Sequence, residues 1–377
     1  MQYMRKKITY NVLYAGLIMI SFLFTSPYFA RAQEVVSEKQ TIMKAEVLEV
    51  MEQERREIPG LDTTTDFQKL RVRILEGEER GKEVVVENDY LNLRAEDIFY
   101  LMHTTNSVDG TDQYSVSDPY RLPVIYFFLA LFVAVVFMFG GMPGVRGLLS
   151  LIFSLLVITY VLLPGILYGY SPVVLSTVIS AVIIIAGSYM THGFNKTTTA
   201  AVVGMLVTIV VTGALAYCAV TYGRLSGFET EESVYLNFNT GGAINFSGLL
   251  LGGIMIGVLG ILYDAAIGQA VAVEELQKAG PHLDRPAIYQ RALRIGREHI
   301  GALVDTLAIA YVGVSLPLLL LFYMSGSDFM LTINREIFAT EILRAMVGGI
   351  GLILSIPIST FFSTRLLVPN KANNVSR

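Results

Sequence analysis

Seven apolar segments, each of about 20 residues, follow one another from Leu122 almost to the C-terminus of this 377-residue chain. They lie at residues 122–140, 147–164, 172–191, 198–220, 245–266, 300–323 and 342–364. A helix of about 20 residues crosses the hydrocarbon core of a bilayer, where no water can satisfy an open backbone. We therefore predict an α-helical polytopic membrane protein, with seven transmembrane helices over residues 120–366.

The composition agrees with this class and excludes several others. Only 16% of the residues are charged, against roughly a quarter in soluble domains. The net charge of -4 gives no basis for binding nucleic acid. Cys218 is the single cysteine, and four histidines are scattered, which argues against a disulfide or a metal site; they are His103, His192, His282 and His299. No catalytic, P-loop or dinucleotide motif occurs, so no enzyme activity or cofactor is predicted.

Residues 1–32 have the pattern of a secretory signal. Three basic residues, Arg5 to Lys7, precede an apolar stretch, and small residues at Ala30 and Ala32 suit cleavage before Gln33. The alternative is an uncleaved anchor helix. Both interpretations place residue 33 outside the cell.

The charges between the predicted spans support one orientation. The predicted inner loops hold the bases Arg146, Lys196, Lys278, Arg285, Arg291, Arg294 and Arg297. The predicted outer loops hold the acids Glu229, Glu231, Glu232, Asp328 and Glu336, with Arg224 and Arg335 as bases. This bias follows the positive-inside rule. We expect a plasma-membrane protein with its N-terminal domain extracellular and residues 367–377 as a cytoplasmic tail.

Residues 33–119 differ in kind from the rest, because they are charged and alternate polar with apolar side chains. The alternation is clearest in "KAEVLEV" (Lys44–Val50), "KLRVRIL" (Lys69–Leu75) and "KEVVVEN" (Lys82–Asn88). Such a period of two is typical of half-buried strands. We predict a small extracellular antiparallel β-domain, with a short loop at Gly77–Gly81 and a mobile loop at Glu52–Asp66.

Small residues recur at helical spacing in three of the predicted spans. The fifth span carries five glycines that we assign to helix packing: Gly248, Gly252, Gly253, Gly257 and Gly260. The fourth span has Gly204, Thr208, Thr212 and Ala216, and the seventh has Gly351, Ser355 and Ser359. Spacing of four residues lets another helix approach closely. These spans are therefore expected to bury one face on protein rather than lipid.

Two aspartates fall inside the predicted spans. Asp264 lies near the inner end of the fifth span, and Asp305 lies about one and a half turns into the sixth. These spans are joined on the inner side, so both carboxylates should lie at similar depth. Intramembrane acids usually face the bundle interior or water. We predict a proton or cation site here, with Thr306, Tyr263 and His299 as hydrogen-bond partners; the alternative is a polar tie between helices.

The sequence resembles the YibE/F-like family of bacterial multi-pass membrane proteins. Two of the blocks that carry the likeness surround the aspartates, "INFSGLLLGGIMIGVLGILYDAAIGQAVAVEEL" (Ile244–Leu276) and "IGREHIGALVDTLAIAYVGVSLPLLLL" (Ile295–Leu321). A third is "QKLRVRILEGEERGKEVVVEN" (Gln68–Asn88), followed by "YRLP" before the first span. The resemblance implies a membrane protein whose biochemical activity is not established. It also implies that the acid within G-x-x-x-D, Asp264, is a steadier feature than Asp305.

Three functions remain open from the sequence. The first is a transporter or permease for an unknown ion or small molecule, using the carboxylate site. The second is a non-catalytic sensor or partner-binding protein of the envelope. A remote third is an intramembrane aspartyl protease, although "GALVD" (Gly301–Asp305) departs from the Gly-x-Gly-Asp motif of such enzymes. The expected partners are the lipid bilayer and either a second membrane subunit or further copies of this chain.

Overall fold

The computed structural model describes residues 39–57, 64–105, 111–326 and 328–369. The chain divides into two compact units, Met1–Val135 and Val136–Arg377, and each unit is described by itself below. The predicted signal or anchor at residues 1–32 lies outside the described residues.

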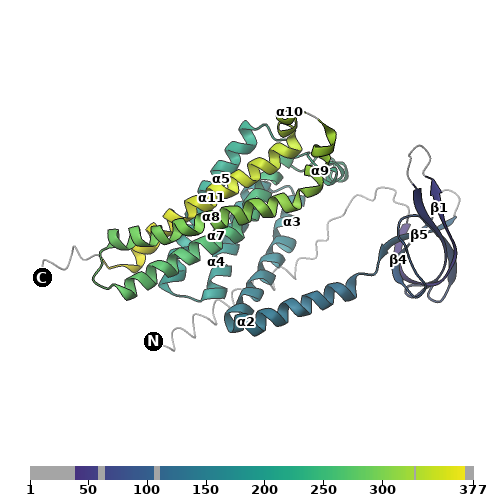
Figure 1. The fold of residues 1–377 in the computed structure, drawn as a ribbon, viewed down its shortest axis with the longest axis horizontal. Helices are drawn as coiled ribbons and strands as arrows, with labels where there is room; N and C mark the ends of the chain where they lie inside the picture. Colours follow the sequence, from purple (N-terminus) through teal and green to yellow (C-terminus); the bar gives the residue numbers. More distant parts are fainter. Residues whose placement is uncertain (1–38, 58–63, 106–110, 327, 370–377) are drawn as a thin grey trace. The chain divides into compact units, whose positions relative to one another are not determined.

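The first unit contains an antiparallel five-stranded sheet that curls into a half-barrel (Figure 1). Its strands are β1 (Lys39–Glu57), β2 (Thr64–Ile74), β3 (Glu83–Asn88), β4 (Ile98–Thr105) and β5 (Asp112–Pro119), in the order β3-β2-β1-β4-β5. Alternate side chains of β2, Leu70, Val72 and Ile74, are buried beside Phe99 and Leu101 of β4. The period of two in the sequence therefore predicts the buried face correctly.

The prediction of a mobile loop at Glu52–Asp66 is wrong for the residues that the structure describes. β1 continues to Glu57, and its end pairs with the start of β2, with Arg55 opposite Asp66. The side chains of this pair also meet, with Arg55 Nε 3.3 Å from Asp66 Oδ1. A two-stranded ribbon satisfies its backbone without any apolar residue, so low hydrophobicity does not indicate a loop.

The remaining elements are helical. They are α2 (Leu122–Val157), η1 (Ile158–Leu162), α3 (Leu163–Leu167), α4 (Pro172–His192), α5 (Lys196–Tyr222), α6 (Glu231–Asn239), α7 (Phe246–Ala279), α8 (Arg285–Val314), α9 (Leu316–Ser325), α10 (Phe329–Ile333) and α11 (Glu336–Leu367). Within the described residues, five helices are long and apolar enough to cross a membrane. The count becomes six if α8 and α9 form one span that bends by 67°.

The helical run from Leu122 to Leu167 is broken inside α2. Gly141 has φ 53° and ψ −147°, which is not helical. A Cβ added at Gly144 would lie 2.9 Å from the carbonyl oxygen of Val136. In a continuous helix these two residues would be about 12 Å apart along the axis. The chain therefore folds back at Gly141, between the first two predicted spans.

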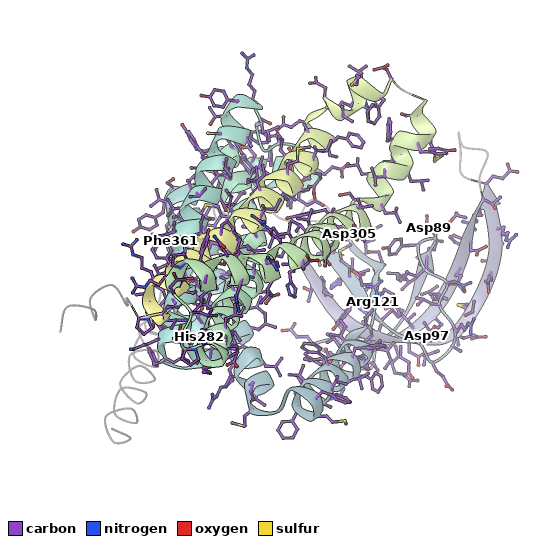
Figure 2. All side chains as sticks on the ribbon, turned by 60° about the vertical axis from the view of Figure 1, so that its left-hand side comes forward. Asp89, Asp97, Arg121, His282, Asp305 and Phe361 are labelled. Carbon is purple, nitrogen blue, oxygen red and sulfur yellow. The ribbon has the colours of Figure 1, made fainter. Side chains whose placement is uncertain are left out.

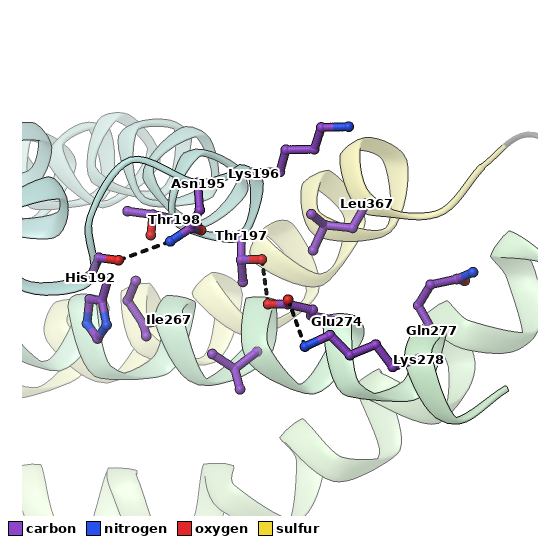
Figure 3. A pocket seen from close by; sticks show the side chains of 11 residues that line it. His192, Asn195, Lys196, Thr197, Thr198, Ile267, Glu274, Gln277, Lys278 and Leu367 are labelled. Carbon is purple, nitrogen blue, oxygen red and sulfur yellow. Dashed lines mark hydrogen bonds and ion pairs between the residues drawn. The ribbon is translucent and has the colours of Figure 1, made fainter. Parts of the chain in front are cut away.

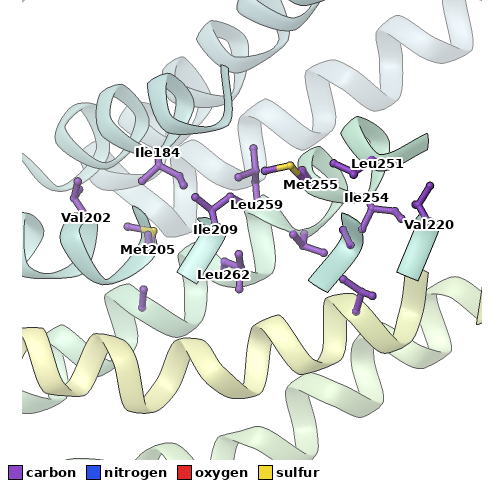
Figure 4. Packing of buried hydrophobic residues seen from close by; sticks show 14 of the residues in the cluster. Ile184, Val202, Met205, Ile209, Val220, Leu251, Ile254, Met255, Leu259 and Leu262 are labelled. Atoms are coloured by element: carbon purple, nitrogen blue, oxygen red, sulfur yellow. The ribbon is translucent and has the colours of Figure 1, made fainter. Parts of the chain in front are cut away.

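In the second unit, α7 and α11 lie at the centre of a bundle. α11 contacts α5, α7 and α8, while α7 also contacts α4 and α5. Figure 4 shows the apolar side chains that fill the space between α4, α5 and α7. Among those that are almost fully buried are Ile184, Met205, Ile209, Ile254 and Leu262.

The small residues of α5 and α11 face each other in one seam. A Cβ added at Gly204 would lie 2.8 Å from Ser359 Cα, and one added at Gly351 would lie 2.5 Å from Thr212 Oγ1. Residue numbers rise along α5 as they fall along α11, so the two helices are antiparallel. Gly and Ser at these positions let the two backbones approach closely.

α7 runs parallel to α4. A Cβ added at Gly248 would lie 3.3 Å from Val173, and one added at Gly252 would lie 3.1 Å from Ser176 Cβ. Residue numbers therefore rise together along this pair of helices. The short loop between α4 and α5, residues 193–195, makes these two neighbours antiparallel.

Candidate functional site

One face of α7 carries Asp264 and has almost nothing packed against it. Its exposed residues are Gly253, Gly257, Gly260, Asp264 and Gly268, which follow one another at steps of three or four residues. Among the described residues, no atom lies within 4 Å of a Cβ added at Gly253, Gly260 or Gly268. At Gly257 the Tyr311 hydroxyl lies 3.7 Å away. Asp264 is therefore the one charged group on an open, glycine-lined helix face.

Asp264 lies within the apolar part of its helix. Between Phe246 and Glu274 it is the only charged residue of α7. At 1.5 Å per residue it is about 27 Å along the helix from Phe246 and about 15 Å before Glu274. Apolar helix therefore extends on both sides of this carboxylate, further than the predicted span 245–266 implies.

Asp305 lies on α8, where Figure 2 labels it, and its side chain is exposed. The facing pairs Gly257–Tyr311 and Gln269–Gly296 show that α7 and α8 are antiparallel. By this register the residue on α8 level with Asp264 is about three positions before Asp305, or about 4.5 Å along the axis. Within the described part of the chain, no hydrogen bond or ion pair is found for either carboxylate.

Within the described residues, none of the three predicted partners is hydrogen-bonded to these carboxylates, and the buried Tyr263 hydroxyl has no hydrogen bond. The Tyr263 ring packs 5.8 Å from the His192 ring of α4. The Thr306 hydroxyl donates to the carbonyl of Ala302 at 2.8 Å, one turn earlier on its own helix. His299 Nδ1 lies 3.0 Å from a backbone carbonyl of α8. Local backbone oxygens are thus the nearest partners of the Thr306 and His299 side chains.

The five glycines assigned to helix packing fall into two sets. Gly248 and Gly252 contact α4, as described above. The others, Gly253, Gly257 and Gly260, belong to the open face beside Asp264. Helical spacing cannot separate these sets, because both have neighbours three or four residues away.

A buried amide on α7 was not singled out from the sequence. Gln269 is 4% exposed, and its Oε1 accepts a hydrogen bond of 2.9 Å from the Thr360 hydroxyl of α11. A Cβ added at Gly296 of α8 would lie 2.6 Å from Gln269 Nε2. This side chain therefore ties α7 to α11 where α8 crosses closest.

A charged cluster at the end where α5 finishes and α11 begins was also missed. Arg344 of α11 pairs with Glu341 at 2.8 Å, and its other nitrogen lies 3.5 Å from Glu229 of the α5–α6 loop. The side chain of Glu229 is 11% exposed and that of Arg344 is 27% exposed. The sequence held a signal, since Arg344 is the one basic residue within any of the seven predicted spans.

A cavity of about 500 Å³ opens at the opposite end of the bundle (Figure 3). Several of the polar side chains that line it are paired with one another. The Thr197 hydroxyl donates to Glu274 Oε2 at 2.6 Å, and Lys278 Nζ lies 2.9 Å from Glu274 Oε1. Elsewhere too, in the ranges that the structure describes, no three His, Cys, Asp or Glu side chains are grouped to hold a metal ion.

Apolar helices packed around small residues, with charged groups within their spans, define a multi-pass α-helical membrane protein that also carries a β-sheet unit. The chain belongs to the YibE/F-like protein family, whose model matches residues 128–369. The β-sheet unit precedes the matched residues. No curated protein and no solved structure matches the chain significantly.

Proposed function

We propose that this protein is a transporter whose translocation route passes Asp264, with a proton or a small cation as the species that binds the carboxylate. The observation that carries the proposal is the open face of α7. A charged aspartate against lipid costs a few kcal/mol, so such residues normally face water, an ion or another protein surface. Asp264 is flanked by Gly260 and Gly268, where no described side chain fills the space.

The break between α8 and α9 supports the same proposal. The two helices bend by 67° at Ser315, and Pro317 lies in the first turn of α9. A helix interrupted within a membrane leaves backbone groups without helical partners, and these are tolerated where they line a cavity or a binding site. Interrupted spans are for this reason a recurring feature of secondary transporters.

The topology we propose has seven spans, an extracellular β-domain and a cytoplasmic C-terminus. The reversal at Gly141 supports two spans within Leu122–Leu167, and α8 with α9 supports one. The antiparallel pairs α5–α11 and α7–α8, and the parallel pair α4–α7, agree with spans that alternate in direction. The positive-inside bias of the connecting segments supports the orientation.

Flux into proteoliposomes tests the proposal. Purified protein would be reconstituted with an internal pH-sensitive dye, and separately with dyes for monovalent and divalent cations. We expect flux above protein-free liposomes, lost in Asp264→Asn and retained in the matched control Asp328→Asn. Asp328 caps the short helix α10 and lies outside the long helices. Full flux in Asp264→Asn would remove this carboxylate from the mechanism, and no flux of any ion by the wild type would count against transport of these ions.

A second candidate function is recognition of an envelope component by the β-sheet unit. The observation that favours it is a polar cavity of about 530 Å³ on this unit, beside the exposed Tyr90. Its lining includes Arg55, Asp66, Asp89 and Asn92. Deleting residues 39–119 discriminates between the two functions, because a transporter core should still conduct, whereas a sensor should lose its response.

A further inference from the structure

The loop between α5 and α6 is fastened to α11 by one carboxylate. Glu336 accepts hydrogen bonds from the backbone N–H of Ser226 and from that of Gly227, the latter at 2.9 Å. The Ser226 hydroxyl lies 2.9 Å from both oxygens of the same carboxylate. These bonds hold the loop against α11 and bring Glu229, three residues after Ser226, next to that helix.

An ionised Glu229 carboxylate would have few close partners in that position. Its Oε1 has a 3.5 Å contact with Arg344, whereas Arg344 holds Glu341 at 2.8 Å. The Thr340 hydroxyl lies beside the carboxyl. Yet neither Glu229 Oε2 nor Thr340 Oγ1, both buried, meets hydrogen-bond geometry with any partner among the described residues.

The surrounding charges also disfavour a third anion. The groups that act on Glu229 from α11 are Arg344, Glu341 and Glu336, which are one cation and two carboxylates. From α8 the phenol of Tyr311 lies close to Arg344 and Glu341. With Glu229 ionised, two carboxylates would share the Arg344 guanidinium with a third, Glu336, nearby, and in such a mostly buried site one carboxyl tends to keep a proton.

We propose that Glu229 is a proton-binding site, neutral while the loop is docked, with its carboxyl O–H donating to Thr340 Oγ1. With the proton on Glu229 Oε2, this oxygen donates a hydrogen bond and the buried Thr340 hydroxyl accepts it. This assignment stands apart from the transport proposal, since it concerns a different cluster, at the start of α11, and requires no flux.

The electrostatics of the loop give the direction of the effect. Burial raises the pKa of Glu229, and the neighbouring Thr340 hydroxyl and Arg344 guanidinium, which both favour the ionised carboxylate, oppose this only in part. A carboxyl whose pKa is raised in the docked state takes up a proton on docking. The docked loop is therefore favoured most at low pH, and this contribution is lost as pH rises through the raised value. The Glu336 anchor does not depend on this proton.

Hydrogen–deuterium exchange of the full-length protein in lipid nanodiscs tests the site. The segment from Leu225 to Thr230 would be followed between about pH 5 and about pH 9, the range that buried glutamates reach. After correction for intrinsic rates, we expect protection to fall by up to about tenfold per pH unit, since one proton is linked. Glu229→Gln should keep the loop protected with no pH dependence, and the exposed control Glu231→Gln should behave as wild type.

A second variant tests the partner of the proton. Thr340→Val removes the acceptor and keeps the shape, so the loss of protection should move to lower pH; a move to higher pH would show that Thr340 instead donates to the ionised carboxylate, and would overturn its role as acceptor. A pH-independent wild-type loop, or an unchanged profile in Glu229→Gln, would overturn the assignment. An unchanged midpoint in Thr340→Val would overturn Thr340 as the acceptor. Because the readout is loop protection, these outcomes are separate from success or failure of the flux assay.

Discussion

The seam between α5 and α11 gives the sharpest test of the packing. A Cβ added at Gly351 would lie 2.5 Å from Thr212 Oγ1, 2.9 Å from Cγ2 and 3.3 Å from Cβ. All three are atoms of one side chain, and the two nearest are removed by Thr212→Ala. Gly351→Ala should therefore destabilise the bundle, and Thr212→Ala should rescue it.

The magnitude follows from three contributions. Overfilling a packed core costs about 1–3 kcal/mol. Replacing glycine by alanine within a helix returns about 1 kcal/mol, so Gly351→Ala alone should cost about 0–2 kcal/mol. Within the described structure the Thr212 hydroxyl is buried without a hydrogen bond, so deleting it leaves no polar group unpaired. We expect a coupling free energy of about 1–3 kcal/mol between the two substitutions.

The measurement is reversible unfolding in mixed micelles with increasing SDS, followed by far-ultraviolet circular dichroism. The chain has no tryptophan, so fluorescence would report poorly. Wild type, both single variants and the double variant form the cycle. Gly260→Ala is the matched control, since a Cβ there meets no described atom within 4 Å. A coupling free energy near zero, or a Gly351→Ala protein as stable as Gly260→Ala, would refute the close seam.

Two further predictions concern the start of α8 and the β-sheet unit. Asp284 caps α8 by accepting a hydrogen bond of 3.0 Å from a backbone N–H. Asp284→Ala should therefore lower the free energy of unfolding by about 1 kcal/mol and speed hydrogen exchange in the first turn of α8. Unchanged exchange would argue against the cap. In the β-sheet unit, the hydrogen bond from Lys82 holds the pKa of Glu79 below its ordinary 4.5. The contribution of the Glu79 carboxylate to stability is present above pH 4.5 and is lost as pH falls through its lowered pKa. Glu79→Gln should therefore reduce the acid-induced loss of hydrogen-exchange protection in β3–β5. An acid profile identical to that of the wild type would contradict this.

The sequence predicts those features that depend on local pattern. Apolar length locates the helices, and the alternation around Leu70, Val72 and Ile74 gives the buried face of β2. The stripes of α5 and α11 were each predicted to bury a face on protein. Their pairing with each other was not predicted, because spacing identifies a face and does not identify its partner.

The glycines of α7 show the same limit at the candidate site. Gly252 and Gly253 are adjacent, yet one contacts Ser176 and the other faces open space. Only the position of α4 separates them, and that position is set by the whole bundle. The pairing of Arg344 with Glu229 was missed for a different reason: the two residues are far apart in sequence, and nothing local to either one identifies the other.

The hydroxyl groups of the bundle show why Asp264 stands apart. Thr208 and Thr364 each donate to a carbonyl one turn earlier on their own helix, at 2.8 Å and 2.7 Å. Such bonds cost no partner on another helix, so small polar residues can line the close seams while the spans stay stable. A carboxylate cannot donate when ionised and finds no carbonyl to bond in this way. Local bonds of this kind account for the Thr208 and Thr364 hydroxyls and are closed to Asp264, which is why a ligand on its open face is the inference to test first.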